Sequence, residues 1–280
     1  MRLAISNLAW PREAEAKVAS LFRQMNVPGV EIAPTKVWPQ PLTVSDREIW
    51  EYRKFWESRG IRIVALQSLL FGRPELQIFA DPSAQIAMLA HLGGMCRLAY
   101  HLGAKALVFG SPKNRRRNSL SEVEAEAIAY GFFRRLGDIA ELHGVTIGIE
   151  ANPVQYQCDF LTRGIDAARF VERLAHPAIA LHLDTACLAL AGETPGPILN
   201  SFATRTCHLH ISEPQLQPIH INSLPHEKIA GEIRQSRYAG WLSIEMQTPA
   251  GVFDPEIFER SLSFVQQRYL PAHAPSARAA

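Results

Sequence analysis

The sequence predicts a single-domain α/β protein with a (β/α)8 TIM-barrel fold, on three observations. The first is its length, because 280 residues suit one such barrel, which typically takes about 250. The second is an alternation of short apolar segments with longer amphipathic ones, which is typical of parallel strands covered by helices. The third is that eight apolar segments occur, and eight strands close a barrel.

The predicted strands are short, aliphatic or β-branched, and most follow a glycine or a proline. They cover 3–10, 29–33, 61–70, 104–110, 145–151, 178–184, 206–212 and 240–246. The alternative fold is a doubly wound open sheet. It is disfavoured because the turn after the first strand, SNLAWPRE, lacks a glycine-rich phosphate-binding loop.

The amphipathic segments between these strands predict helices with recognisable ends. One begins at Pro11, which suits a first helical turn, and another begins after Ser45, which forms a capping box with Glu48. Further helices are expected over 83–103, 119–144, 162–176 and 254–270. The barrel is expected to span 1–272, with 273–280 as a flexible C-terminal tail.

Bulk composition excludes several classes of protein. A formal net charge of +2 gives no overall electrostatic case for a nucleic-acid partner. No segment approaches the roughly 18 apolar residues of a membrane span, and the N-terminal sequence lacks the apolar run of a secretory signal. The four cysteines fit neither a C-x-x-C motif nor a zinc knuckle, so reduced thiols are expected. We therefore expect a cytoplasmic protein that acts on a small molecule, with homo-oligomerisation left open.

Polar residues end the last four predicted strands, at the end of the barrel where TIM-barrel active sites lie. They are Glu150, Asp184, His210 and Glu245. Their apolar neighbours along each strand should face the helices, because side chains alternate between the two faces. Three convergent carboxylates repel one another, and a divalent cation removes that cost. One ion held by these four residues is therefore predicted. Mn²⁺, Mg²⁺ or Co²⁺ suits an oxygen-rich set with one imidazole, and Zn²⁺ is a further option.

Two further histidines, His182 and His208, share a face with Asp184 and His210. They should lie one layer deeper in the barrel, so we interpret them as core residues with satisfied ring nitrogens.

At these residues the sequence resembles the xylose isomerase-like TIM-barrel superfamily, through the segments IGIEAN, LHLDTAC, CHLHISE and YAGWLSIEM. That group includes ketose 3-epimerases, hydroxypyruvate isomerase, inosose dehydratase and endonuclease IV. In its epimerase branch the matching Glu, Asp, His and Glu bind Mn²⁺ or a similar ion, and the two glutamates also move protons. The resemblance therefore implies that Glu150 and Glu245 are metal-bound acid/base residues.

The predicted function is a divalent-metal-dependent isomerase or epimerase of a sugar or sugar derivative, including an anionic one. A metal ion would stabilise an enediolate while a carboxylate removes the proton next to the carbonyl. A dehydratase similar to inosose dehydratase would share this first step, and it is the main alternative. Two departures keep it open: Cys187 stands where the sugar epimerases carry a His, and 212–217 lacks their substrate-binding Arg.

Two weaker alternatives are an endonuclease IV-like nuclease and a non-catalytic barrel. The near-neutral charge opposes the nuclease, as do Gln67 and Phe109 at strand positions where its additional metal ligands might be expected. The intact set of four ligands opposes the non-catalytic barrel.

Residues near the same end of the barrel are candidates for substrate contact. They are Trp10, Glu31, Lys36, Gln67, Lys113, Arg115, Asn152, Cys187 and His226. An aromatic ring such as Trp10 could stack on a sugar or simply pack a loop. The basic loop 113–117 could attract an anionic substrate or be a solvated loop. Cys187 fits a pocket thiol, an extra metal ligand or a small buried residue, and His226 fits a substrate contact or a surface position.

Overall fold

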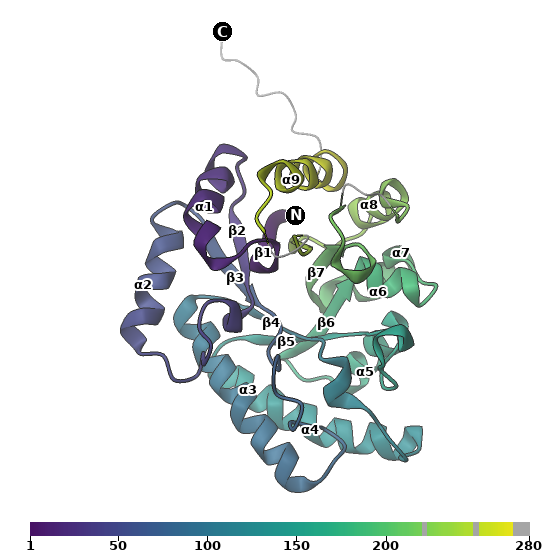
Figure 1. The fold of residues 1–280 in the computed structure, drawn as a ribbon. Helices are drawn as coiled ribbons and strands as arrows, with labels where there is room; N and C mark the ends of the chain where they lie inside the picture. Colours follow the sequence, from purple (N-terminus) through teal and green to yellow (C-terminus); the bar gives the residue numbers. More distant parts are fainter. Residues whose placement is uncertain (220–222, 249–251, 271–280) are drawn as a thin grey trace.

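A computed structural model describes residues 1–219, 223–248 and 252–270. Its eight parallel strands close into a barrel in the order β1 to β8, with helices around the outside (Figure 1), and this confirms the predicted fold class. The strands are β1 (Arg2–Ser6), β2 (Gly29–Ile32), β3 (Arg62–Leu66), β4 (Ala106–Phe109), β5 (Thr146–Glu150), β6 (Ile179–Asp184), β7 (Thr206–Ser212) and β8 (Trp241–Glu245). The predicted C-terminal tail lies outside the described residues, so that expectation stays a prediction.

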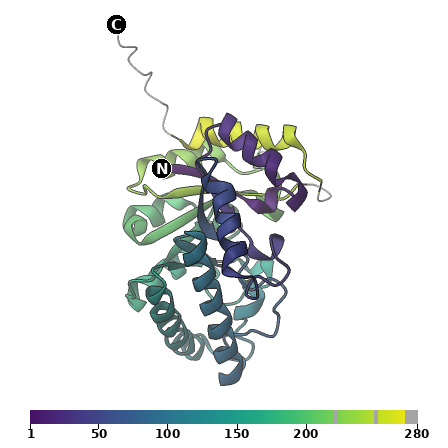
Figure 2. The same cartoon turned by 90° about the vertical axis from the view of Figure 1, so that its left-hand side faces the viewer.

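The helices form the outer layer, and Figure 2 views the barrel from the side that α1, α2 and α3 cover. Their bounds are α1 (Glu15–Gln24), α2 (Asp46–Glu57), α3 (Pro82–Leu102), α4 (Glu122–Leu142), α5 (Gly164–Leu174), α6 (Thr185–Leu190), α7 (Pro195–Phe202), α8 (His226–Gln235) and α9 (Pro255–Tyr269). The expected capping box is present, because the Ser45 hydroxyl accepts from the Glu48 amide while the Glu48 carboxylate accepts from the Ser45 amide. The helices expected from the sequence did not include α6, α7 or α8, which are only 6, 8 and 10 residues long.

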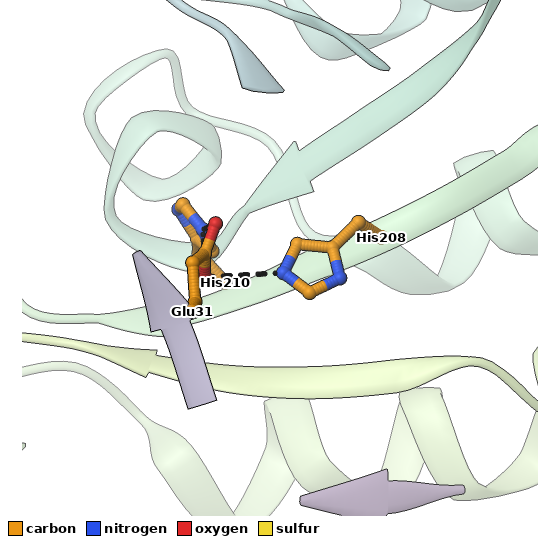
Figure 3. A group of neighbouring side chains, drawn as sticks. All are labelled: Glu31, His208 and His210. Carbon is orange, nitrogen blue, oxygen red and sulfur yellow. Dashed lines mark hydrogen bonds and ion pairs between the residues drawn. The ribbon is translucent and has the colours of Figure 1, made fainter. Parts of the chain in front are cut away.

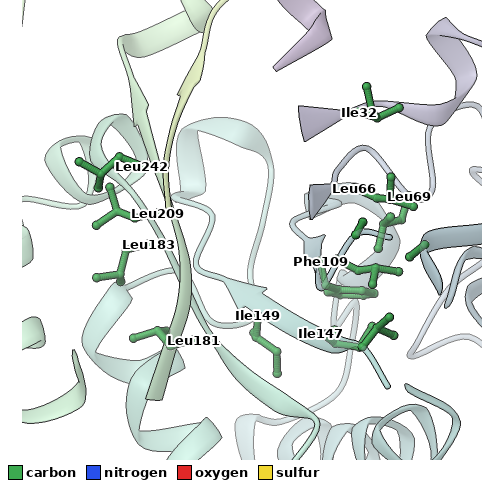
Figure 4. Packing of buried hydrophobic residues seen from close by; sticks show 14 of the residues in the cluster. Ile32, Leu66, Leu69, Phe109, Ile147, Ile149, Leu181, Leu183, Leu209 and Leu242 are labelled. Carbon is green, nitrogen blue, oxygen red and sulfur yellow. The ribbon is translucent and has the colours of Figure 1, made fainter. Parts of the chain in front are cut away.

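Alternation along the strands separates an apolar outer face from a polar inner face. Ile149, Leu183, Leu209 and Leu242 are buried, and Figure 4 shows them around the outside of the strand ring, where the helices cover them. Burying one such side chain contributes about 1.5–3 kcal/mol to folding. This packing fixes the phase of each strand and therefore directs the polar residues between them toward the barrel axis.

Among the described residues, no helix combines the length and the apolar character that crossing a bilayer requires.

Candidate metal and active site

The four predicted metal ligands lie together at the carboxyl ends of β5 to β8. Strand register places Asp184 beside His210 across β6 and β7, while Glu150 pairs with His182 and Glu245 with Ser212. The Nδ1 atom of His210 lies 3.3 Å from Oε2 of Glu245 and 3.9 Å from both Oδ2 of Asp184 and Oε1 of Glu150. Three carboxylates therefore surround one imidazole nitrogen.

Glu31 of β2 orients that imidazole from the opposite side (Figure 3). The Nε2 atom of His210 lies 3.0 and 3.1 Å from the two Glu31 oxygens, and Nε2 of His208 lies 3.1 Å from Oε2 of the same carboxylate. An ionised carboxylate only accepts hydrogen bonds, so each histidine donates to it from Nε2. This contact turns Nδ1 of His210 toward the three carboxylates. It is the arrangement that commonly orients a metal-binding histidine.

The residues present fit a divalent cation. The Nδ1 atom of His210 is buried and has no hydrogen-bond partner, although three carboxylates lie within 3.9 Å of it. A position with so much negative charge and a ring nitrogen without a hydrogen bond requires a cation or a proton. Three oxygen donors and one imidazole suit the ions expected from the sequence.

Titration of the metal-free site follows the same charges. Burial alone would lower the pKa of His210, but the negative charges of Glu31 and Glu245 raise it well above its usual range. Burial would raise the pKa of Glu31, yet His210 and His208 hold it well below the ordinary value. Burial and the neighbouring Glu150 raise the pKa of Asp184 to about 7. Without a metal, protons therefore supply the positive charge that the site needs.

The two deeper histidines differ in their surroundings. His208 has a hydrogen-bond partner at Nε2, which is Glu31, but its Nδ1 is buried without one, so the expectation of satisfied ring nitrogens holds for one nitrogen only. His182 has no hydrogen-bond partner at either ring nitrogen, and its Nε2 lies 3.3 Å from Oε1 of Glu150. Burial lowers its pKa well below the usual range, so it is a neutral ring against Glu150. The interpretation of His182 as a satisfied core residue is therefore wrong.

An open cavity of about 410 Å³ leads to these ligands. Gln67, Asn152 and Cys187, which were predicted to contact substrate, line it together with the four ligands. Other lining residues include Tyr156, Ser212, Glu213, Gln215, Leu216 and Gln247. The volume lies in the range of small-molecule sites.

Gln67 and Asn152 each hold one of the two glutamates. Nε2 of Gln67 donates to Oε1 of Glu245 at 2.6 Å, and Nδ2 of Asn152 donates to Oε2 of Glu150 at 2.8 Å. In both glutamates the other oxygen is the one nearest His210 Nδ1. Each carboxylate therefore has one oxygen turned toward the ion site and one held by an amide.

Six of the nine predicted contacts do not line this cavity, and Glu31 and Trp10 are two of them. Glu31 lies beneath the ligands and does not line the cavity, because its carboxylate is occupied by the two histidines. Trp10 is 1 % exposed and packs against Phe22 and Phe258 in the outer layer. Trp10 does not face the barrel axis because β1 ends at Ser6 and a short 3-10 helix, Asn7–Ala9, separates the strand from Trp10.

Lys36 lines a separate cavity of about 250 Å³ beside the first one. Its ammonium group donates to the carbonyl oxygen of Trp10 at 2.7 Å, which joins the loops after β1 and β2. Burial lowers the pKa of Lys36.

The arginines of the basic loop after β4 bind backbone carbonyl groups at the end of β5 and in the loop after it. Arg115 is 0 % exposed and donates through Nη2 to the carbonyl oxygen of Glu150 at 2.6 Å. Arg116 and Arg117 donate to the carbonyl oxygens of Gln157 and Asp159 in the loop after β5. Lys113 is exposed and does not line the cavity. The placement of Arg115 does not fit an anion-binding role, because a fully buried guanidinium is out of reach of a substrate.

His226 also lies inside the protein. Its Nε2 lies 2.8 Å from Oε1 of Glu213, and its Nδ1 lies 2.5 Å from the Tyr269 hydroxyl. Glu213 in turn accepts from the backbone and the hydroxyl of Ser223. This network joins the loop after β7 to α8 and α9, so His226 is a buried structural group and not a surface residue.

Sequence reasoning missed Ser212, whose hydroxyl donates to Oδ2 of Asp184 at 2.6 Å. Strand alternation could have found it, because it lies two residues after His210 on the same face. It also missed Tyr156, which lines the cavity from a 3-10 turn after β5. No periodic pattern identifies a side chain in such a loop.

Comparisons with known proteins agree with this architecture. The D-psicose 3-epimerase of Clostridium cellulolyticum H10, solved with D-tagatose, is 16% identical with a TM-score of 0.79, covering 97% of this chain and 100% of its own. A 3-keto-D-glucoside 4-epimerase from E. coli is 16% identical with a TM-score of 0.76, covering 95% and 99%. A family 2 AP endonuclease from Brucella melitensis is also 16% identical, with a TM-score of 0.72 and coverage of 95% and 99%.

At these identities the structural likeness establishes the fold. No curated protein sequence matches the chain. A family model described as a xylose isomerase-like TIM barrel matches residues 20–268. The chain therefore belongs to the xylose isomerase-like TIM-barrel family.

Proposed function

We propose that the protein is a divalent-metal-dependent isomerase or epimerase of a sugar or sugar derivative. The observation that carries the proposal is the convergence of three carboxylates on the buried Nδ1 of His210, beside an open cavity. Similar solved structures include epimerases of D-psicose and of a 3-keto-D-glucoside, which supports a sugar as the substrate class.

A divalent cation held by Glu150, Asp184, His210 and Glu245 would stabilise negative charge that develops on a substrate oxygen. Glu150 and Glu245 then serve as the acid/base pair. They come from β5 and β8, which are not neighbours in the barrel, so their carboxylates reach the cavity from different strands. One glutamate removes the proton next to the carbonyl, and the other returns a proton to the resulting carbon or oxygen.

Gln67 and Asn152 position this pair. Each amide donates to the glutamate oxygen that is turned away from His210, and the second lone pair of that oxygen would exchange a proton with substrate. Preorganised amide contacts of this kind keep a base within hydrogen-bond reach of its target.

A metal-dependent dehydratase is the second candidate, and the composition of the cavity favours it. The loop after β7 contributes Gln215 and Leu216 to the cavity and no arginine, while α6 contributes Cys187. The contacts that the resemblance implies for a ketose are therefore replaced. A lyase needs the same first proton transfer and then the departure of a hydroxyl group.

Proton NMR in D₂O separates the two candidates. The protein is stripped of metal with a chelator, reloaded with Mn²⁺, Mg²⁺, Co²⁺ or Zn²⁺, and incubated with ketoses, keto-glycosides and polyol ketones. Metal-dependent deuterium incorporation at one sugar carbon is expected for an isomerase or epimerase, and loss of water for a dehydratase. Glu245→Gln should slow this reaction, because it removes one member of the acid/base pair. Glu51→Gln, on the exposed face of α2, is its control. If no substrate reacts with any ion, the proposal is wrong.

A further inference from the structure

Cys187 lies in the first turn of α6, directly behind the metal ligand of β6. Its backbone amide donates to Oδ1 of Asp184 at 2.6 Å, which fixes the position of the residue relative to that carboxylate. The side chain lines the cavity and is 8 % exposed as a residue. Its Sγ atom and one carboxylate oxygen each of Glu150 and Asp184 all lie within 4.8 Å of one another.

That spacing is close to the reach of one ion, because 4.8 Å is the upper bound of these separations. Metal–sulfur bonds of about 2.3 Å and metal–oxygen bonds of about 2.0–2.2 Å allow two ligands to be up to about 4.5 Å apart. A second observation concerns the same two carboxylates. The Nδ1 atom of His210, on a side chain 1 % exposed and without a hydrogen-bond partner there, lies 3.9 Å from oxygens of Glu150 and of Asp184. Glu150 and Asp184 are therefore shared by the imidazole and the thiol.

We propose that Cys187 is an additional, thiolate ligand of this site, and that the site prefers Zn²⁺ or Co²⁺ to Mn²⁺ or Mg²⁺. Thiolate sulfur is a soft donor, which strengthens the binding of zinc and cobalt more than that of the harder ions. On binding, the S–H bond breaks, the proton passes to solvent and a sulfur–metal bond forms, with no change of oxidation state. The inference rests on the metal site of the proposed function and is independent of the sugar.

The other cysteines offer matched controls. Among the described residues, none of Cys96, Cys158 and Cys207 belongs to a group of donors that could hold a metal ion. Cys207 is the best comparison, because it is in β7 near the amino end of the strand and is partly exposed. Cys207→Ser therefore makes the same chemical change as Cys187→Ser away from the ligands.

Titration of the metal-free, full-length protein with Co²⁺ tests the proposal directly. A thiolate ligand gives an intense sulfur-to-cobalt charge-transfer absorption in the near ultraviolet, which oxygen and imidazole ligands do not give. We expect this band at one equivalent in the unaltered protein and in Cys207→Ser, and its loss in Cys187→Ser. Competition with a chelator should show that Cys187→Ser binds Zn²⁺ at least about tenfold more weakly. Loss of a group that only orients a metal ligand already costs about 10–100-fold in affinity, and a direct ligand should cost no less. Mn²⁺ affinity should change far less.

Stoichiometric Co²⁺ binding without the band in the unaltered protein, or a band that persists in Cys187→Ser, would overturn the proposal. If Cys187→Ser does not fold, X-ray absorption of the cobalt-loaded unaltered protein decides, since a sulfur neighbour at about 2.3 Å is then required. If the charge-transfer band is present but no sugar reacts, the proposed function is refuted and the thiolate ligand is not. If the cobalt-loaded protein epimerises a sugar but shows no charge-transfer band, the thiolate ligand is refuted and the proposed function is not.

Discussion

Replacing Glu31 by glutamine should weaken metal binding without touching a metal ligand. Two Glu31 oxygens accept from Nε2 of His210 at 3.0 and 3.1 Å, and one of them also accepts from Nε2 of His208. In Glu31→Gln, whichever way the amide is turned, its nitrogen replaces an oxygen that lies within 3.1 Å of His210 Nε2. A donor then faces a donor, which favours the tautomer with the proton on Nδ1, the atom that should bind metal.

The magnitudes follow from those contacts. Hydrogen bonds to a charged group contribute about 1.5–3 kcal/mol each, and the amide can keep only part of the set, so unfolding free energy should fall by about 2–4 kcal/mol. Loss of the partner that orients a metal-binding histidine typically costs about 10–100-fold in metal affinity. The variant should therefore bind metal at least about tenfold more weakly and unfold at lower denaturant concentration.

Two measurements check this. Metal affinity is measured by competition with a chromophoric chelator, and stability by urea unfolding of the metal-free protein followed by circular dichroism. Glu51→Gln, which makes the same chemical change on the surface of α2, is the control. A folded Glu31→Gln protein with unchanged metal affinity would refute the orienting role of Glu31.

The remaining predictions concern the same ligands. Glu150→Gln and Glu245→Gln should each lower turnover by about 10²–10⁴-fold in steady-state assays, the usual contribution of acid–base catalysis, and near-normal rates would contradict their roles. Gln67→Ala and Asn152→Ala should lower kcat while equilibrium dialysis still finds one bound ion, because each amide holds an oxygen turned away from the ion site. Since the pKa of Asp184 rises from 3.8 to about 7 on folding, the native metal-free protein keeps a proton that the unfolded chain loses. Its unfolding free energy should therefore fall as pH rises from about 4 to about 7. Calorimetry should then find a larger metal-induced rise in Tm at pH 8 than at pH 5, and the reverse order would rule this out.

The barrel and the convergence of the four proposed ligands could be predicted from the sequence, because both depend on local periodicity. A two-residue repeat in segments such as LHLD and HLHIS places every second side chain toward the axis, whatever the loops do. Gln67, which was expected to contact substrate, directly follows β3 and lines the cavity. Burial of Leu183 and Leu209 outside the ring fixes that phase.

Trp10, Arg115 and His226 show where periodicity stops. Each follows the end of a strand or of a loop, where the direction of the side chain depends on partners distant in the sequence. Trp10 packs on Phe258, and His226 binds Tyr269. Such contacts over tens to hundreds of residues leave no repeat in the sequence. A basic loop therefore looked like an anion site although its arginines bind backbone carbonyls.

The resulting charge balance bears on the substrate. Four carboxylates surround the ring of His210: Glu31 lies at Nε2, and Glu150, Asp184 and Glu245 lie near Nδ1. With all four ionised, a divalent cation leaves an excess of two negative charges, or three if Cys187 is a thiolate, and the buried Arg115 offsets one of them. Of the cations in the loop 113–117, the three arginines already donate to the loop after β5 or to β5 itself. For the sugar substrate of the proposed function, we therefore expect a neutral molecule to bind more strongly than a phosphorylated one, because an added anion close to the proposed ligands would meet uncompensated negative charge.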